Sequence, residues 1–372
     1  MRDVELRHLL TLFRILVDKP VLLASLLESA GSAGDIIGSS REFHLSGSPA
    51  GISELIRRKI KPGLIQRVDK DIEWLAAEGH HLLVLGQANY PSLLAQIADP
   101  PVLLFCRGNL DALDQFKIAM VGSRNPTNMG VKHAEQFARQ LASIGIAVTS
   151  GLALGIDGAS HRGALSVDGI TLAVLGSGCD VIYPFRHAKL ARAIEMQGLI
   201  VSEFPLGTPA YPANFPRRNR VVTGMSLGTL VVEAQARSGS LISARHAMEQ
   251  GREVFAIPGS IQSRQSRGCH KLIRDGAILI ENPDQILEEI GSLAEFQSRH
   301  RLQVKQRQGK SGGGLELSPT KSAIIDLLGA EPMSLDQLCN LLGQEVSELL
   351  AALVELEIDD LIVNEAGGYC LA

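Results

Sequence analysis

The chain has 372 residues, of which 45% are apolar, 4% aromatic and 20% charged, so a mainly disordered chain is excluded and two or three domains with aliphatic cores are expected. The formal charge of −4 excludes a protein that is basic overall, although Arg outnumbers Lys by 25 to 11. Arg is the side chain best suited to bidentate phosphate recognition and to stacking on bases.

The five Cys are scattered, with no Cys-x-x-Cys pair, so we expect neither a disulfide framework nor a zinc ribbon. No run of 18 uncharged apolar residues occurs, and the start of the chain does not have the layout of a signal peptide. We therefore predict a cytoplasmic protein without a membrane segment.

Residues 1–80 predict a small helical domain. Apolar residues recur at helical spacing, as in Leu6, Leu9, Leu10, Phe13 and Leu16. Breaks are expected at residues 19–20, around 31–38 and at 61–63, where Pro or Gly occurs. Two hypotheses stay open for this domain: a packing appendage, or a helical DNA-binding module.

Residues 81–292 alternate between predicted strands and helices, which is typical of a doubly wound α/β domain. Helices are expected at 131–143 and 240–250, among others. Several of the strands are continuous apolar runs, which favours a parallel sheet buried on both faces. The predicted strands are 82–85, 102–105, 118–121, 146–149, 170–175, 199–202, 229–232, 253–257 and 277–280.

Residues 293–317 predict a flexible basic linker, because the stretch 296–315 carries five Arg and Lys without an acid and contains three consecutive Gly. Residues 318–372 then predict three helices, the third at 344–358, followed by two short strands at 361–363 and 369–371. This order is typical of a winged helix. The module holds ten acids against Lys321, so we expect it to bind protein, or the basic face of its own chain, rather than DNA.

Glycine and hydroxyl residues follow the predicted strands where helices begin. The carboxyl ends of parallel strands meet at one edge of a sheet, and backbone N–H groups at helix starts form anion sites. Several such loops together predict a phosphate-bearing ligand. The candidate residues in these loops are Gly122, Ser123 and Arg124, then Ser150, Gly151, Gly155 and Asp157, then Ser238, Gly239 and Ser240.

Known cofactor motifs are not matched. A Walker A loop is missing, and the dinucleotide fingerprint begun by Gly176 fails because Val181 stands where its third Gly belongs. Ser226 has the spacing of a nucleophile elbow, but a strand follows it, which favours a plain turn. Asp157 and His161 lie one helical turn apart, and a hydrogen-bonded pair is favoured over a metal pair. We expect no cofactor and no metal.

The segment 214–274 is the most basic part of the chain, with ten Arg and Lys against three Glu. Phe215 precedes the cluster Arg217, Arg218, Asn219 and Arg220, so an unpaired base could stack beside phosphate-binding cations. Lys271 is expected to extend the same face. The alternative for this segment is a solvated helix face that Phe215 anchors.

The order of these motifs resembles that of the DNA-processing protein A (DprA/Smf) family. The matching blocks are VGSR (121–124), SGLA (150–153) with GID (155–157), ASHRGAL (159–165), YP (183–184), SEFP (202–205), FPRRNR (215–220), RSGSL (237–241), GREV (251–254) with PG (258–259), and GC (268–269) with LI (272–273) and DGA (275–277). They cover residues 110–285, and the flanking units match the family layout more loosely. Leu154 and Pro212 stand where basic residues occur in other members.

The resemblance implies an extended Rossmann-like domain, flanked by a small helical domain of the SAM or helix-hairpin-helix type and by a winged helix. It implies a nonenzymatic homodimer that binds single-stranded DNA, protects incoming strands and loads the RecA recombinase during natural transformation. In that case the Gly-Ser loops and Arg124 hold phosphates, Phe215 meets a base, and the arginines of 217–220 line the pocket.

A rival hypothesis is a Rossmann-like nucleotide sensor or nucleotide hydrolase. Such hydrolases resemble this chain in the loop after 229–232 but use a carboxylate where Ser243 stands here. Glu203 and Glu233 remain as other acids at the same sheet edge. A scaffold that binds nothing is disfavoured by the several phosphate-type loops.

Overall fold

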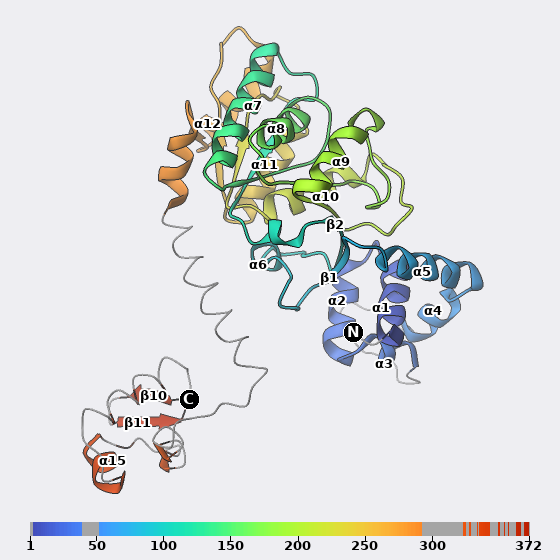
Figure 1. The fold of residues 1–372 in the computed structure, drawn as a ribbon, viewed down its shortest axis with the longest axis vertical. Coiled ribbons are helices and arrows are strands. Elements are labelled where there is room, and N and C mark those ends of the chain that lie inside the picture. Colours follow the sequence, from blue (N-terminus) through green and yellow to red (C-terminus); the bar gives the residue numbers. More distant parts are fainter. Residues whose placement is uncertain are drawn as a thin grey trace. The chain divides into compact units, whose positions relative to one another are not determined.

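The computed structural model describes residues 3–38 and 52–291 and short stretches between 323 and 371. Two compact units are present, Met1–Glu295 and Phe296–Ala372 (Figure 1). The basic linker predicted at 293–317 lies outside the described residues.

The first unit begins with short helices. Pro20 and Pro62 occupy the first positions of α2 and α5, where the missing N–H costs nothing. The expected break over 31–38 was too long, because only Gly31, with φ of 76°, ends α2 before the next helix starts. The helices are α1 (Asp3–Ile15), α2 (Pro20–Ala30), α3 (Ala33–Gly38), α4 (Ile52–Lys59) and α5 (Pro62–Leu75).

All nine strands predicted between 81 and 292 form one sheet, in the order β1-β2-β6-β5-β4-β3-β7-β8-β9. The seven strands from β6 to β9 in this order are parallel to one another. Strand β2 is antiparallel to both of its neighbours, β6 and β1, so β2 is the reversed strand of this sheet. The strands are β1 (His80–Val84), β2 (Leu103–Gly108), β3 (Lys117–Val121), β4 (Ala147–Ser150), β5 (Thr171–Val174), β6 (Leu199–Ser202), β7 (Gly228–Val231), β8 (Glu253–Ala256) and β9 (Ile278–Leu279).

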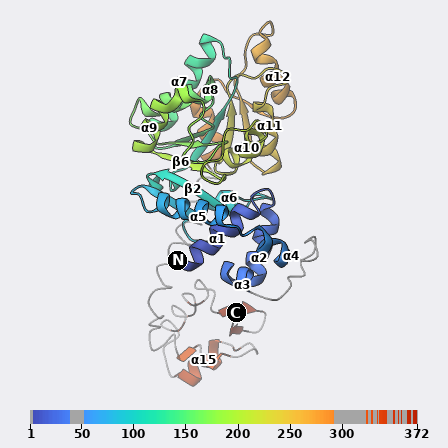
Figure 2. The same cartoon turned by 90° about the vertical axis from the view of Figure 1, so that its right-hand side faces the viewer.

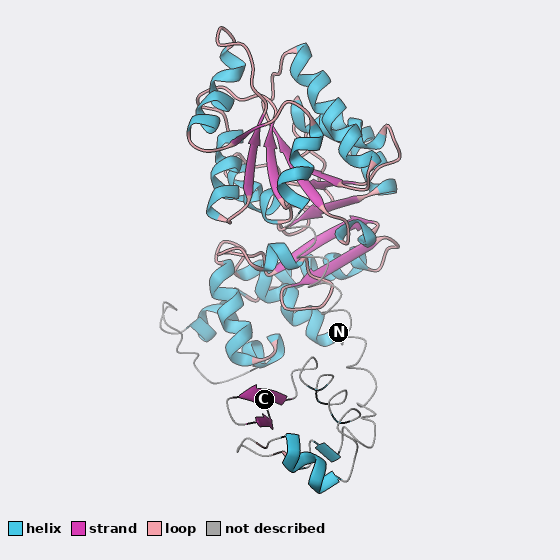
Figure 3. Cartoon of the chain, turned by 90° about the vertical axis from the view of Figure 1, so that its left-hand side faces the viewer, coloured by secondary structure: helices cyan, strands magenta, loops and turns pink. Residues whose placement is uncertain are grey.

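Helices cover both faces of the sheet (Figure 3). Alternate residues of one strand enter different cores, as expected for a pleated strand buried on both sides. Ile118 and Met120 of β3 pack with α7 and α8, whereas Ala119 and Val121 share a core with α10, α11 and α12. These helices are α7 (Asn128–Ser143), α8 (Ile156–Leu165), α9 (Ala188–Gln197), α10 (Asn214–Gly224), α11 (Ser240–Glu249) and α12 (Arg267–Arg274).

The N-terminal helices share a core with the sheet rather than standing apart from it (Figure 2). The ring centroids of Phe13 and Phe105 lie 6.0 Å apart, and both residues are buried. Arg14 pairs with buried Asp71 and donates a hydrogen bond to the carbonyl of Leu206 at 3.1 Å. The helices are therefore fixed to the sheet, and the domain boundary at residue 80 stays a prediction.

The described parts of the second unit have the elements of a winged helix. Helix α15 (Leu335–Leu342) precedes the antiparallel hairpin of β10 (Ile362–Glu365) and β11 (Gly368–Leu371). A single bridge from Met333 to Tyr369 adds a third chain segment to this sheet. The core joins Ile324, Leu328, Leu338, Leu349, Leu353, Leu356 and Ile362. The predicted fold class is thus confirmed for both units.

Candidate nucleic-acid interface

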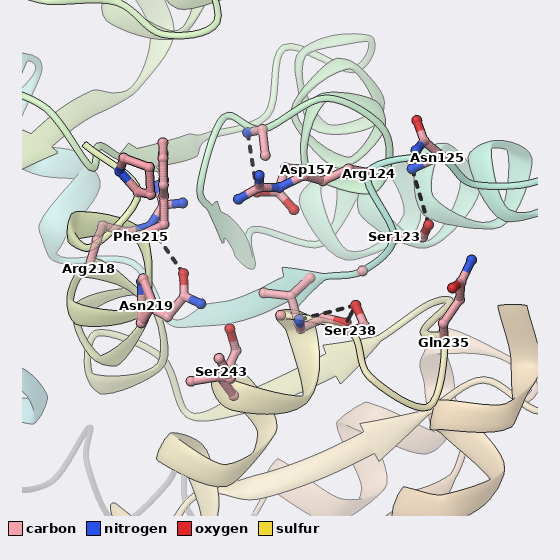
Figure 4. A pocket seen from close by; sticks show the side chains of 18 of the residues that line it. Ser123, Arg124, Asn125, Asp157, Phe215, Arg218, Asn219, Gln235, Ser238 and Ser243 are labelled. Atoms are coloured by element: carbon pink, nitrogen blue, oxygen red, sulfur yellow. Dashed lines mark hydrogen bonds between the residues drawn. The ribbon is translucent and has the colours of Figure 1, made fainter. Parts of the chain in front are cut away.

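A cavity of about 600 Å³ opens where the winding of the sheet reverses direction. Strand β3 pairs with β4 on one side and with β7 on the other, so the loops after β3 and β7 diverge and leave a crevice at their carboxyl ends. The cavity is lined by residues of four regions: 121–125 after β3, 153 and 157 at the start of α8, 183 with 210–219 on and before α10, and 235–243 around the start of α11 (Figure 4).

The loop before α11 and the first turn of that helix form one wall. Gly239 and Ser240 line the cavity, and the Ser238 and Ser240 hydroxyls lie 2.7 Å apart. Ser238 Oγ also accepts a hydrogen bond from the backbone N–H of Ser240. The N–H groups of Ser240, Leu241 and Ile242 already have acceptors in residues 238 and 239, so the hydroxyls and the positive end of the helix dipole are what this wall offers to an anion.

One face of α10 forms the opposite wall, made by Phe215, Arg218 and Asn219 at helical spacing (Figure 4). The guanidinium carbon of Arg124 lies 5.1 Å from the centroid of the Phe215 ring, which is a cation–π distance. Tyr183 packs beside the same ring, and the two ring centroids lie 5.8 Å apart. An exposed cation and an aromatic face therefore meet at the rim of the cavity.

Arg218 lies in the cavity wall, as the resemblance implies, but is only 3% exposed. Its Nη1 donates to the carbonyl of Gly151 at 2.7 Å and to that of Val174. Burial lowers the pKa of Arg218 to about 10. The side chain thus joins α10 to the ends of β4 and β5 and leaves a positive charge under the cavity.

Arg217 and Arg220 do not line the cavity, contrary to the prediction. Arg220 is buried, and its Nη2 donates to Oε2 of Glu203 at 2.6 Å. Its Nε lies 3.0 Å from Oδ2 of Asp99. Arg217 contacts Glu203 at 3.2 Å and donates to the carbonyl of Val17 at 2.9 Å. The reason is helical geometry: 217 and 220 share one face of α10, and 215, 218 and 219 share another.

The residues of the Gly-Ser loops also divide into those that line the cavity and those that do not. Gly122 and Ser123 line the cavity, and Ser123 Oγ accepts a hydrogen bond from the N–H of Asn125 at 3.1 Å. Ser150 and Gly151 do not, because the Ser150 hydroxyl is buried against the Met120 carbonyl at 2.6 Å.

Gly155 also lies outside the lining. It has φ of 82°, and a Cβ there would lie 2.3 Å from the Ser123 carbonyl oxygen. It therefore allows the loop after β4 to pack on the loop after β3.

Asp157 lines the cavity, where its Oδ2 accepts a hydrogen bond from the N–H of Ala153 at 3.3 Å. Burial raises the pKa of Asp157 despite the nearby charge of Arg218. The predicted hydrogen bond between Asp157 and His161 was wrong, because His161 Nδ1 bonds the Thr171 hydroxyl at 2.7 Å. Within the described residues no cluster of metal-ligating side chains occurs.

The sequence prediction also missed cavity residues. Asn125, Tyr183, Gln235 and Ser243 line the cavity but are not among the predicted site residues. Arg237 lines it as well, in agreement with its place in the block 237–241 and in the basic segment. Tyr183 lies in the loop after β5 and in the block 183–184, but its spacing alone does not indicate that it reaches the cavity. Lys271, a predicted site residue, is exposed on α12 and does not line the cavity.

The candidate catalytic groups have structural partners. Ser226 is buried and donates to the Val222 carbonyl at 2.9 Å, which agrees with a turn. The Glu233 carboxylate accepts bonds from the N–H and hydroxyl of Thr127, the residue that caps α7. Glu203 is buried against Arg220.

In the described part of the chain, no helix is long and apolar enough to cross a membrane.

The fold and its switch-point cavity define a doubly wound α/β protein with a basic, aromatic-walled crevice. The family model of DNA recombination-mediator protein A matches residues 81–291, and that of the DprA winged helix domain matches 312–368. The chain belongs to the DNA recombination-mediator protein A family.

Among its relatives, Protein Smf of Escherichia coli is 42% identical over 81% of this chain and 80% of its own length. The X-ray structure of DNA processing protein A from Streptococcus pneumoniae is 39% identical, with a TM-score of 0.57, over 64% of this chain and 86% of that one. The structure of DNA processing protein A from Helicobacter pylori, a protein with a unique single-stranded DNA binding mode, is 31% identical, with a TM-score of 0.52, over 57% of this chain and 96% of that one.

Proposed function

We propose that the cavity binds single-stranded DNA, with phosphates at the first turn of α11 and beside Arg124, and with a base on Phe215. The observation that carries this proposal is the Arg124–Phe215 contact at the rim, which offers a cation and a π-face at one place. A duplex would present its phosphates outward and keep its bases stacked inside, so it could not use Phe215. The single-stranded DNA binding mode of the Helicobacter pylori relative supports this choice of ligand.

Phe215→Ala and Arg124→Ala separate the two parts of the proposal. Loss of stacking should weaken binding by about 1–3 kcal/mol without changing the salt dependence. Loss of Arg124 should weaken binding and also reduce the salt slope by about 0.7. Fluorescence anisotropy with single strands and with duplex of equal length, at several salt concentrations, measures both. Equal affinity of the wild type for duplex would contradict the proposal, and an unfolded Phe215→Ala would favour the anchor hypothesis.

We further propose that the chain acts as a homodimer that protects incoming strands and loads the RecA recombinase onto them during natural transformation, in the cytoplasm. Membership of the recombination-mediator family supports this role. The test is RecA filament formation on strands coated with single-strand-binding protein, with and without this chain. No acceleration at saturating protein would overturn the loading step and leave the DNA-binding step intact.

The rival nucleotide sensor or hydrolase has one observation in its favour, since 600 Å³ also suits a free nucleotide. Against hydrolysis, we propose that the chain is not an enzyme, because Ser243 replaces the required carboxylate and Glu233 is held by Thr127. Incubation with nucleoside monophosphates should release no base. Base release that is lost in Glu233→Gln would establish the rival.

A further inference from the structure

The loop 203–213 and helix α10, which together form one side of the cavity, are attached to the N-terminal helices. Ala210 and Pro212 of this loop line the cavity, and Phe215 of α10 follows them. Among the described residues that line the cavity, none lies before Val121, so helices α1 to α5 contribute no group to it. The attachment therefore acts on the residues of the cavity from behind.

Arg217 makes the first attachment. Two residues turn a helix by about 200°, so Arg217 and Phe215 lie on opposite sides of α10. Nη2 of Arg217 donates to the carbonyl of Val17, in the turn between α1 and α2, at 2.9 Å, and its Nε lies 3.2 Å from Oε2 of Glu203. Its guanidinium carbon also lies 5.4 Å from the centroid of the Phe204 ring. One side chain thus connects α10, the start of the loop and the N-terminal helices.

Arg14 of α1 makes the second attachment, to the loop itself. Its Nη2 donates to the carbonyl of Leu206 at 3.1 Å, while its Nε donates to the fully buried carboxylate of Asp71 on α5 at 2.6 Å. Both oxygens of Asp71 bind this guanidinium, which fixes its orientation. One residue further along the loop, the N–H of Gly207 donates to Asp180 at 2.9 Å. The loop is thus held to α1 before it reaches the cavity.

The first turn of α10 depends on such outside contacts because it has no side-chain cap. Ala213 precedes the helix and supplies no capping hydrogen bond, and the ends of helices open readily without one. Asn214 Nδ2 donates to the carbonyl of Gly176 at 3.0 Å, and Arg217 supplies the next contact outside the helix. Phe215 lies between these two residues, so the position of its ring depends on both.

We propose that Arg217 is a positioning residue for the single-strand site: together with Arg14 it connects α10 and the loop 203–213 to the N-terminal helices and keeps Phe215 where a base can stack on it. The inference rests on the proposed function of the cavity and gives the N-terminal helices a part in that function without contact to DNA. Linkage is reciprocal, so a strand that binds the positioned ring also stabilises the attachment of α1 and α2.

The experiment uses Arg217→Met in the full chain. Met keeps an apolar side chain beside the Phe204 ring, and Glu203 keeps Arg220 as its partner, so the variant should fold. The matched control is Arg7→Met, which also removes one cation and one ion pair, between α1 and α5. Anisotropy with an oligothymidylate over a range of salt concentrations compares the wild type, both variants, Phe215→Ala, and the double variant Phe215→Ala/Arg217→Met.

We expect Arg217→Met to bind about fivefold more weakly, which is the result if the ring occupies its binding position about a fifth of the time. Its salt slope should equal that of the control, because a residue behind the helix releases no counterions. In the Phe215→Ala background the same substitution should change little, since the ring that it positions is gone. A fivefold loss in that background, or a salt slope smaller than that of the control, would overturn the inference. Unchanged affinity of Arg217→Met would also overturn it and leave the proposed function intact.

A second measurement uses the unaltered protein. Amide hydrogen exchange is followed with and without saturating oligothymidylate, and we expect slower exchange in α1 and α2 as well as in α10, by a factor of about five. Slower exchange confined to the residues that line the cavity would contradict the inference, because a purely structural Arg217 would not carry the effect to the N-terminal helices. A wild type that binds no oligothymidylate would instead refute the proposed function of the cavity, and this inference with it.

Discussion

Two groups of arginines, separated by one helix, show how differently the same side chain is used in this protein. At the cavity rim Arg124 is exposed, and its contact is the face of Phe215. On the far side of α10, Arg220 is buried against Glu203. The same division occurs within α10, where Arg218 lies in the cavity wall whereas Arg217 and Arg220 pair with Glu203, so the face of the helix that each residue occupies decides its role.

Breaking the buried group should have a large effect on stability. Glu203→Ala leaves Arg220 buried with only half-exposed Asp99 beside it, so we expect the free energy of unfolding to fall by about 3–5 kcal/mol. Urea denaturation followed by circular dichroism measures this loss. Arg245→Ala, an exposed cation of the same basic segment, is the control and should change stability by less than about 0.5 kcal/mol. A similar small change in Glu203→Ala would erase the distinction between the two groups.

Arg218 lies between the two groups and sharpens the comparison. Arg218→Ala removes charged hydrogen bonds to the carbonyls of Gly151 and Val174, and each such bond contributes about 1.5–3 kcal/mol. We expect this variant to lose both stability and DNA affinity, whereas Arg124→Ala loses affinity alone. Denaturation and anisotropy on the same two preparations test this. An Arg218→Ala variant as stable as the wild type would mean that its buried contacts contribute nothing to folding.

Most of the fold could be predicted from the sequence because the physical signals were local. Apolar runs marked the nine strands, several of them continuous, and Pro20 and Pro62 marked the starts of two helices. The reversed direction of β2 could not be predicted, since an apolar run does not encode strand direction. In the site, the loops after β3 and β7 were found from their Gly and Ser residues. The helical spacing of α10 already implies that Arg217 and Arg218 lie on different faces. The pairing of Arg217 and Arg220 with Glu203 could come only from the tertiary structure.

A smaller effect concerns Asp157, the one acid among the described residues that line the cavity. Because burial raises its pKa, this carboxyl becomes neutral at a higher pH than an ordinary aspartate as the solution is acidified. The loss of a negative charge beside the phosphates should tighten DNA binding by about threefold, or ~0.7 kcal/mol. Anisotropy from pH 7.5 downward measures the trend, and Asp157→Asn, which keeps an oxygen to accept from Ala153, should bind with less pH dependence. Identical pH profiles would assign the trend to other groups.

The smallest effect is expected from removing the C-terminal module. Residues 318–372 carry a net charge of −9, and the rest of the chain carries +5, so the module contributes repulsion toward a phosphate backbone. Deleting residues 316–372 should leave the affinity for single strands unchanged at moderate salt and raise it slightly at low salt, where the charge is less screened. The compact unit Met1–Glu295 contains the whole cavity lining, so the deletion leaves the site complete. A large loss of affinity would show that the acidic module takes part in DNA binding, and the charge argument would then be wrong.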